Sequence, residues 1–199
     1  MTQLLLACGA IAGPLFIIIF LIEGWLRPGY DALRQSVSSL SQGPRGWIQQ
    51  FNFFSSGALL AAFAFGLRAM LAPLGSTWTW LLIFSYALGL IGAGLFITDA
   101  GSGAPRTRAG IIHDLFSTVV FFSLCIDCFV FAHLFARRGL IGWEWYSLIT
   151  GVFYAAGFII FARAFSPKSR WVSIGGLLQK ITISIGALWL ASVAIELAR

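Results

Sequence analysis

Residues 96–114 read FITDAGSGAPRTRAGIIHD and separate two long apolar runs of the chain. One run ends at Asp99 and the next begins at Ile111, so the Gly-, Pro- and Arg-containing loop between them lies where lipid is expected to begin. Asp99, His113 and Asp114 stand at the two edges of this loop. Ionisable groups near the hydrocarbon are costly, and they need a partner or a function. The stretch therefore predicts two membrane-spanning helices that are joined by a polar turn.

The composition of the whole chain is that of a membrane protein. Of its 199 residues, 59% are hydrophobic and only 10% are charged, and the mean hydropathy is +0.89. Soluble domains carry about 25% charged residues, so this chain has too few charges to cover a water-exposed surface. The net charge of +6 comes from basic residues between the apolar runs. That placement favours contact with anionic lipid headgroups and argues against nucleic acid as a partner.

Six apolar runs are each long enough to cross a bilayer. They predict an all-α fold, a polytopic transmembrane bundle of six helices, and their short connections leave no room for a soluble domain. We therefore expect a single integral membrane domain over residues 1–199. The expected helices cover residues 4–26, 48–71, 78–98, 111–135, 143–165 and 174–197. In the longest polar connection, Leu33, Val37 and Leu40 have helical spacing, which predicts a short interfacial helix over residues 30–40.

Polar side chains gather on one side of the predicted bundle. The first, third and fifth connections share that side, and with the adjoining helix ends they hold Glu23, Tyr30, Asp31, Ser36, Gln49, Gln50, Asn52, Asp99, His113, Asp114, Gln179 and Lys180. Lys180 lies about 9 Å inside its helix at 1.5 Å per residue. It needs either an acidic partner, for which Asp99 and Asp114 are the candidates, or an upward reach to the interface. Such a pair is interpreted as a structural ion pair or as part of a substrate site. Glu23 is interpreted as an interfacial carboxylate that faces water.

The basic residues also predict an orientation. Nine Lys and Arg residues belong to the polar side of the bundle and four to the other side. Cytoplasmic loops carry an excess of these residues. The count therefore predicts that the polar side faces the cytoplasm and that both termini lie outside.

The two histidines exclude one cofactor arrangement. His113 and His133 are twenty residues apart on one predicted helix, about 30 Å at helical rise, so they cannot both ligate one haem within one chain. The sequence specifies no other cofactor. His113 adjoins Asp114 and can lie across the loop from Asp99, which makes the three candidate metal ligands or a candidate acid and base. Asp127 is the deepest charge, and we expect it to bond to a neighbouring helix, with a proton relay as the alternative.

Several short motifs are spaced along nearly the whole chain. They are Gly29-Tyr30 with Ser36-Val37-Ser38-Ser39-Leu40-Ser41, the run from Gly94 to Asp99, Thr107-x-x-Gly110-x-x-His113, and Gly176-Leu177-x-Gln179-Lys180. In this pattern the chain resembles the prokaryotic six-helix membrane proteins known as domain of unknown function 998. Lys180 departs from the pattern, which more often has Arg there. The resemblance implies six helices, a shared polar face and a multi-pass location in a prokaryotic plasma membrane, and it supplies no reaction.

Three functions remain open at this point. The first is binding, without chemistry, of a lipid headgroup or a small polar ligand at the polar face. Its candidate ligand-binding residues are Tyr30, Ser36, Ser39, Asp99, His113, Gln179 and Lys180. The second is an intramembrane lipid-modifying, hydrolase-like enzyme in which Asp99, His113 and Asp114 act as acid and base or hold a metal. The third is a structural or assembly subunit whose polar face only fastens the helices together. The one-sided polar clustering favours the first, and the sequence leaves the ligand, any activity and the oligomeric state open.

Overall fold

The protein is a bundle of membrane-spanning helices. The computed structural model describes residues 1–71, 78–101, 105–166 and 168–199. The helices are α1 (Thr2–Leu26), α2 (Gly46–Leu71), α3 (Trp78–Leu95), α4 (Arg108–Arg137), α5 (Ile141–Ala164) and α6 (Gly175–Leu197). In the part of the chain that is described, all six are long and apolar enough to cross a membrane, and no strand occurs. The predicted all-α, six-helix transmembrane fold is confirmed, and the chain is a multi-pass membrane protein.

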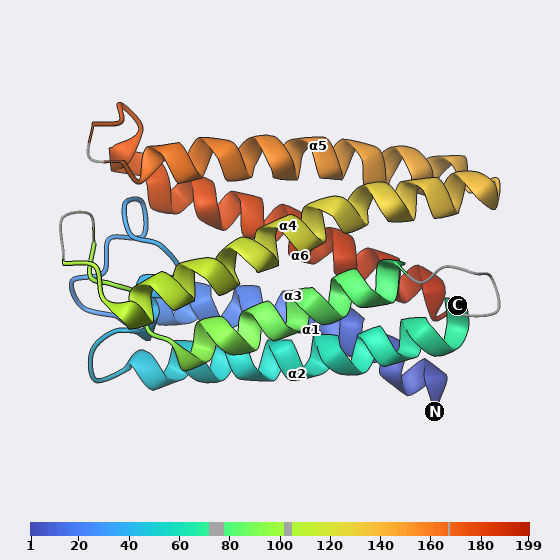
Figure 1. Ribbon diagram of the computed structural model, residues 1–199, viewed down its shortest axis with the longest axis horizontal. Helices are drawn as coiled ribbons and strands as arrows, with labels where there is room; N and C mark the ends of the chain where they lie inside the picture. Colours follow the sequence, from blue (N-terminus) through green and yellow to red (C-terminus); the bar gives the residue numbers. More distant parts are fainter. Residues whose placement is uncertain (72–77, 102–104, 167) are drawn as a thin grey trace.

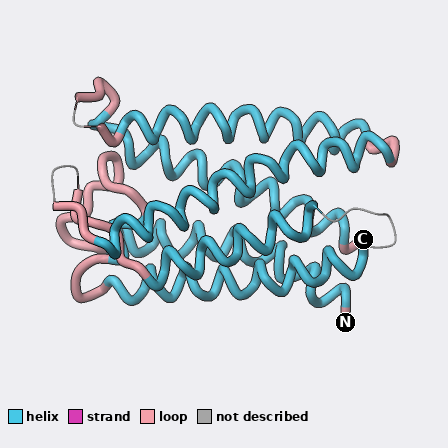
Figure 2. The backbone as a smooth tube through the Cα atoms, in the orientation of Figure 1, coloured by secondary structure: helices cyan, strands magenta, loops and turns pink. Residues whose placement is uncertain are grey.

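The helices form a closed ring. Each helix packs against its neighbours in the sequence, and α6 returns to pack against α1. Figure 1 shows the connection 27–45 and the described parts of 96–107 and 165–174 at one end of the bundle, which we call the polar end. The two termini lie at the other end. Figure 2 shows the same division, with the larger loops gathered at the polar end. The first, third and fifth connections therefore share a side, as the sequence predicted.

The largest differences from the predicted helix boundaries are at the loop between α3 and α4. α3 ends at Leu95, before the predicted residue 98, and α4 begins at Arg108, before the predicted residue 111. The earlier start of α4 has a local cause, because Thr107 is its N-cap and accepts a hydrogen bond from the Gly110 backbone N–H at 3.0 Å. Threonine at this position satisfies one of the free N–H groups of a first helical turn.

The predicted interfacial helix over residues 30–40 is wrong. Only a 3₁₀ turn at Ser38–Ser41 is helical in that segment. Asp31 Oδ1 instead accepts hydrogen bonds from the backbone N–H groups of Leu33 at 3.0 Å and Arg34 at 3.2 Å. Short polar side chains of this kind offer the backbone an alternative to helical bonds. Backbone groups of Ala32, Leu33, Gln35 and Val37 bond to α6.

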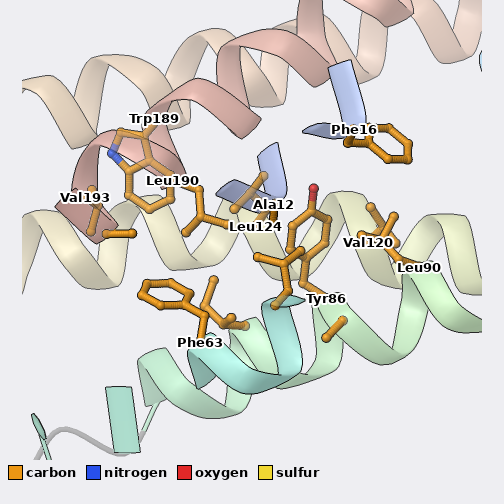
Figure 3. Packing of buried hydrophobic residues seen from close by; sticks show 14 of the residues in the cluster. Ala12, Phe16, Phe63, Tyr86, Leu90, Val120, Leu124, Trp189, Leu190 and Val193 are labelled. Carbon is orange, nitrogen blue, oxygen red and sulfur yellow. The ribbon is translucent and has the colours of Figure 1, made fainter. Parts of the chain in front are cut away.

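The bundle interior is filled from all sides by large apolar side chains. Figure 3 shows Phe63 of α2, Tyr86 of α3, Leu124 of α4 and Trp189 of α6 directed toward one another, with Phe16 of α1 beside them. All of these side chains are buried. Between membrane helices such packing is stabilised by van der Waals contact rather than by exclusion of water. Large apolar residues on the outside of the ring remain exposed for lipid, as on the outer face of α5.

Candidate functional site

Lys180 fastens α6 to the connection between α1 and α2, which we call the α1–α2 segment (residues 27–45). Its Nζ donates to the backbone carbonyl oxygens of Ala32 at 3.0 Å and Gln35 at 2.8 Å. The side chain is buried, and no carboxylate among the described residues forms an ion pair with it. The predicted pairing of Lys180 with Asp99 or Asp114 is therefore wrong. Backbone carbonyl dipoles take the place of the acid, because the segment folds directly over the ammonium group.

The rest of the motif 176–180 contacts the same segment. Leu177 donates its backbone N–H to the Leu33 carbonyl oxygen at 3.0 Å, and Gln179 Oε1 accepts from the Val37 backbone N–H at 2.9 Å. A Cβ on Gly176 would lie 2.2 Å from the Gln35 carbonyl oxygen, so only glycine permits this approach. Every named residue of the motif thus holds the α1–α2 segment against the first turns of α6.

Tyr30, Ser36 and Ser39 stabilise the segment from within. The Tyr30 hydroxyl donates to the Ser36 carbonyl oxygen at 3.0 Å, and the Ser39 hydroxyl donates to the same oxygen at 2.7 Å. The Ser36 hydroxyl accepts from the Ser39 backbone N–H at 3.1 Å. Lys180 Nζ lies 5.1 Å from the centre of the Tyr30 ring, a cation–π distance. Burial raises the pKa of Tyr30 above its ordinary value, which keeps the hydroxyl a donor.

Asp99 closes the loop onto the start of α4. Its carboxylate accepts hydrogen bonds from the Thr107 hydroxyl at 2.6 Å and from the Thr107 backbone N–H at 3.1 Å. A Cβ on Gly110 would overlap the carboxylate, so glycine lets the acid approach the helix. The hydrogen bond from the Thr107 hydroxyl holds the pKa of Asp99 below its ordinary value. The negative charge also lies at the positive end of the helix dipole.

His113 fastens α4 to the end of α3. It is buried, and its Nδ1 lies 3.0 Å from the Ala93 carbonyl oxygen and 2.7 Å from that of Phe96. Both neighbours are acceptors, so Nδ1 carries the proton and donates. The bonds occupy carbonyl groups at the C-terminal end of α3 that lack a partner within the helix.

Asp114 faces away from His113. Its carboxylate is half exposed and pairs with Arg106 Nη2 at 2.9 Å, while Arg106 Nε is 4.0 Å from Asp99. Across the described residues, no three side chains of His, Cys, Asp or Glu are grouped as a metal site. The geometry thus brings Asp99 and Asp114 to one arginine and directs His113 into the core. It adds no support to the metal and acid–base hypotheses for these three residues.

Glu23 is buried, so its predicted exposure to water is wrong. Its carboxylate accepts hydrogen bonds from Arg27 Nε at 3.0 Å and from Arg45 Nε at 3.0 Å. Arg27 Nη1 also donates to the Gln42 carbonyl oxygen at 3.0 Å. The two arginines lie at the two ends of the α1–α2 segment, and the acid joins them below it. A buried carboxylate held by two guanidinium groups is a structural cluster whose loss leaves uncompensated charge.

Under the α1–α2 segment lies a cavity in the middle of the ring. Its volume is about 40 Å³, enough for roughly three water molecules, and side chains from the segment and from all six helices line it. The lining residues are Phe16, Val37, Ser38, Phe53, Tyr86, Leu90, Ala93, Ser117, Val120, Phe121, Tyr154, Gln179 and Ile183. We call this space the central cavity. It extends about 10 Å along α3, from Ala93 near the polar end to Tyr86.

The polar groups of the central cavity differ from those of the polar end. Within the part of the chain that is described, the hydroxyls of Ser38, Tyr86, Ser117 and Tyr154 make no hydrogen bond, and neither does Nε2 of Gln179. Tyr86, Tyr154 and Gln179 are more than nine-tenths buried. Figure 3 shows the Tyr86 hydroxyl pointing away from α3 into the interior. Buried polar groups are normally bonded, so the free groups of the buried Tyr86, Tyr154 and Gln179 are the feature that needs explanation.

Comparison with protein families places the chain among membrane proteins without an assigned activity. The family described as protein of unknown function DUF998 matches residues 10–196. The chain belongs to the DUF998 family. The match covers all six helices. Comparisons with curated proteins and with solved structures gave no match.

Two of the motifs on which the predicted resemblance was based are explained by packing at the polar end. The motif at 107–113 joins the end of α3 to the start of α4 through Thr107, Gly110 and His113. The motif at 176–180 holds the α1–α2 segment on α6. Of the predicted ligand-binding residues, only Gln179 lines the central cavity. The others lie above it or beside it and are bonded within the protein.

Sequence reasoning missed the tyrosines of the central cavity. Tyr86 and Tyr154 stand in the middle of apolar helices, away from the interfaces where tyrosine is expected in membrane proteins. That position is a usable signal, because a mid-helix phenol needs a polar partner or a polar space. Ser38 and Ser117 carry no comparable signal, since serine is common at helix contacts in membranes.

Asp127 lies apart from this site. It is fully buried in α4, and neither carboxylate oxygen has a hydrogen-bond partner among the described residues. The predicted bond to a neighbouring helix is therefore wrong. Asp127 does not line the central cavity.

Proposed function

We propose that this protein binds a small polar molecule in the central cavity, without chemical conversion. One observation carries the proposal, namely five uncommitted polar groups around a cavity that is otherwise apolar. Ligand sites have this composition, with mostly hydrophobic walls and a few polar groups that fix orientation. The predicted function, binding of a lipid headgroup or small polar ligand at the polar face, is retained in modified form. The proposed ligand site lies below the polar face, in the central cavity. Gln179 belongs both to the predicted site and to the proposed one.

In the proposed function, the polar end covers the central cavity. The α1–α2 segment contributes Val37 and Ser38 to the cavity wall, and the bonds from Lys180 and Gln179 hold the segment in place. Tyr30, Ser36, Ser39, Asp99 and His113 then act by fixing the helix ends rather than by touching the ligand. This part of the molecule has the fastening role that the structural hypothesis described.

Filling the cavity tests the proposal. Ala93 is buried and lines the cavity, so Ala93→Leu places additional carbon atoms in it. Wild-type protein purified in mild detergent is expected to retain a small molecule, detected by mass spectrometry of an organic extract. The variant is expected to retain about a tenth as much or less, because a loss of 1.4 kcal/mol in binding is a tenfold change.

Two further variants make the result interpretable. Ser117→Leu fills the same cavity from α4 and is expected to reproduce the loss. Ala156→Leu makes the same change as Ala93→Leu on an exposed position of α5 and is expected to behave as wild type. Equal retention in wild type and in both cavity variants would contradict the proposal.

We also propose that the polar end faces the cytoplasm of a prokaryotic plasma membrane. The support is the excess of basic residues at that end, nine against four. Lys180, Arg27 and Arg45 are committed to internal bonds, which leaves six against four. A single cysteine at exposed Arg106 is expected to react with a membrane-impermeant maleimide only after the cells are opened. Labelling in intact cells would reverse the assignment.

A further inference from the structure

The cations at the polar end fall into two groups. Those of the first group are held by a carboxylate or by backbone carbonyl groups, and they are Arg27, Arg34, Arg45, Arg106 and Lys180. Those of the second group form no ion pair among the described residues, and they are Arg108, Arg163, Lys168 and Arg170. All but Arg108 belong to the end of α5 and the connection from α5 to α6. We call Arg163, Lys168 and Arg170, together with the adjacent Trp171, the basic corner.

No nearby acidic residue in the sequence balances the charge of the basic corner. The sequence has no Asp or Glu between Glu144 and Glu196. Glu144 lies in the first turn of α5 and Glu196 near the end of α6, both at the opposite end of the bundle. The three cations of the basic corner are exposed. Figure 1 shows the described parts of 165–174 at the outer edge of the polar end, so this charge is available to a partner outside the bundle.

Exposed apolar side chains adjoin these cations. Ile159 and Ile160 are exposed, and they precede Arg163 by four and three residues, so they lie one turn deeper on the same side of α5. Trp171 is also exposed, and the centre of its ring is 4.9 Å from the Arg170 guanidinium carbon, a cation–π distance. Tryptophan in such a position is typical of the level of the lipid headgroups. The surface of the protein therefore changes from apolar to cationic within one helical turn.

We propose that the basic corner binds the headgroup of an anionic phospholipid in the leaflet at the polar end. The phosphate accepts charge-assisted hydrogen bonds from Arg163 and Arg170, and the acyl chains lie against the exposed isoleucines of α5. A soluble phosphate would pair with the cations but would leave Trp171 and the isoleucines without a contact. A zwitterionic lipid carries its own ammonium group and gains less from three cations. The proposal concerns the outside of α5 and α6, and it does not depend on a ligand in the central cavity.

The experiment measures lipid binding to the full chain in a neutral detergent by native mass spectrometry. Dioleoylphosphatidylglycerol is the anionic probe, and dioleoylphosphatidylcholine is the zwitterionic probe with the same acyl chains. The anionic lipid is expected to bind at least about thirtyfold more tightly, since each cation near an anionic lipid surface contributes about fivefold. Arg163→Gln/Arg170→Gln is expected to weaken binding of the anionic lipid about tenfold or more on the same grounds. Arg163→Lys/Arg170→Lys keeps both charges and is expected to stay within about threefold of wild type.

Arg137→Gln/Arg138→Gln is the matched control, because it removes two exposed arginine charges at the opposite end of the bundle. This variant is expected to bind the anionic lipid as wild type does. An equal loss in both glutamine variants would show an effect of net charge alone and would overturn the proposal. Equal binding of the two lipids by wild type, or a lysine variant as weak as the glutamine variant at the basic corner, would overturn it too.

A soluble competitor tests the source of the phosphate. Glycerol 3-phosphate carries the charged group of the lipid without its acyl chains. Added at the same concentration as the dioleoylphosphatidylglycerol, it is expected to leave the bound lipid in place. Displacement of the lipid would assign the basic corner to a soluble phosphate compound and contradict the proposal. None of these outcomes bears on the central cavity, which Ala93→Leu tests separately.

Discussion

The polar end and the central cavity both hold buried polar side chains, but these side chains are in opposite states. At the polar end, Lys180 and His113 bond to backbone carbonyl oxygens, and Glu23 bonds to two arginines. In the cavity, the hydroxyls of Tyr86 and Tyr154 have no partner among the described residues. The bonds of these residues at the polar end thus hold helix ends together. Neutral groups deeper in the bundle keep free hydrogen-bonding groups, and the proposed function assigns them to the ligand.

The comparison predicts that Lys180 is needed for folding. Lys180→Met removes the buried ammonium group that bonds to the carbonyl oxygens of Ala32 and Gln35 and is expected to lower the free energy of unfolding by about 2–4 kcal/mol. Equilibrium unfolding of the purified protein in mixed micelles of detergent and SDS measures this change. Lys168→Met is the control, because Lys168 is exposed. A Lys180→Met protein as stable as wild type would show that the polar end is not fastened in this way.

Substitution of His113 is expected to destabilise the protein somewhat less than substitution of Lys180. His113→Ala removes the bonds to Ala93 and Phe96 and is expected to destabilise the protein by about 1–3 kcal/mol. His133→Ala, an exposed position on the same helix, is expected to be neutral. The metal content of the purified variants is measured at the same time. A stoichiometric metal that is present in wild type and absent in His113→Ala would favour the enzyme hypothesis and contradict a purely structural role.

Asp99 is expected to make the protein lose stability as the pH falls. Its pKa is lowered in the folded protein because the Thr107 hydroxyl donates to it. The stabilisation is therefore complete above the ordinary value near 3.8 and is lost as the pH falls through the lower folded value. Unfolding followed between pH 6 and about 3 is expected to show a shallower acid loss in Asp99→Asn than in wild type. Asp114→Asn serves as the control, and an equal change in both variants would argue against a special role for Asp99.

The smallest stability effect is expected inside the cavity. Tyr154→Phe removes a hydroxyl that makes no hydrogen bond in the described structure, so its stability is expected to stay within about 0.5 kcal/mol of wild type. Equilibrium unfolding in the same mixed micelles checks this. A loss of about 2 kcal/mol or more would show that the hydroxyl is bonded within the protein. Such a loss would remove the distinction between the two regions.

The sequence predicted the fold because apolar length and loop order determine it. Six long apolar runs and short connections allow few arrangements other than an antiparallel ring with alternate loops on one side. The end of α3 was harder to predict from the sequence, since Phe96 and Ile97 continue the apolar pattern after the helix has ended at Leu95. Similarly, nothing local in residues 30–40 reveals that their backbone partners lie on α6, more than a hundred residues away.

The candidate site could be predicted only in part. The sequence identified the polar end and its residues correctly as a group, because ionisable side chains are conspicuous in an apolar chain. It could not show that backbone carbonyl groups would satisfy Lys180 and His113, since those bonds depend on the path of the loops. The cavity is a space between six helices, and no pattern in one helix reports it. Gln179 was found because it belongs to a motif, whereas Tyr86 and Tyr154 do not.

The attachment of the α1–α2 segment to α6 has a consequence for biosynthesis. Residues 32–37 emerge from the ribosome more than 140 residues before the groups that bind them, on residues 177–180. The first hairpin must therefore wait in the membrane with unbonded carbonyl groups until the sixth span has been inserted. A chain that stops after α5 would present this unfinished segment as a mark of incomplete synthesis. Removal of α6 is accordingly expected to lead to rapid degradation of the fragment rather than to a stable five-helix protein.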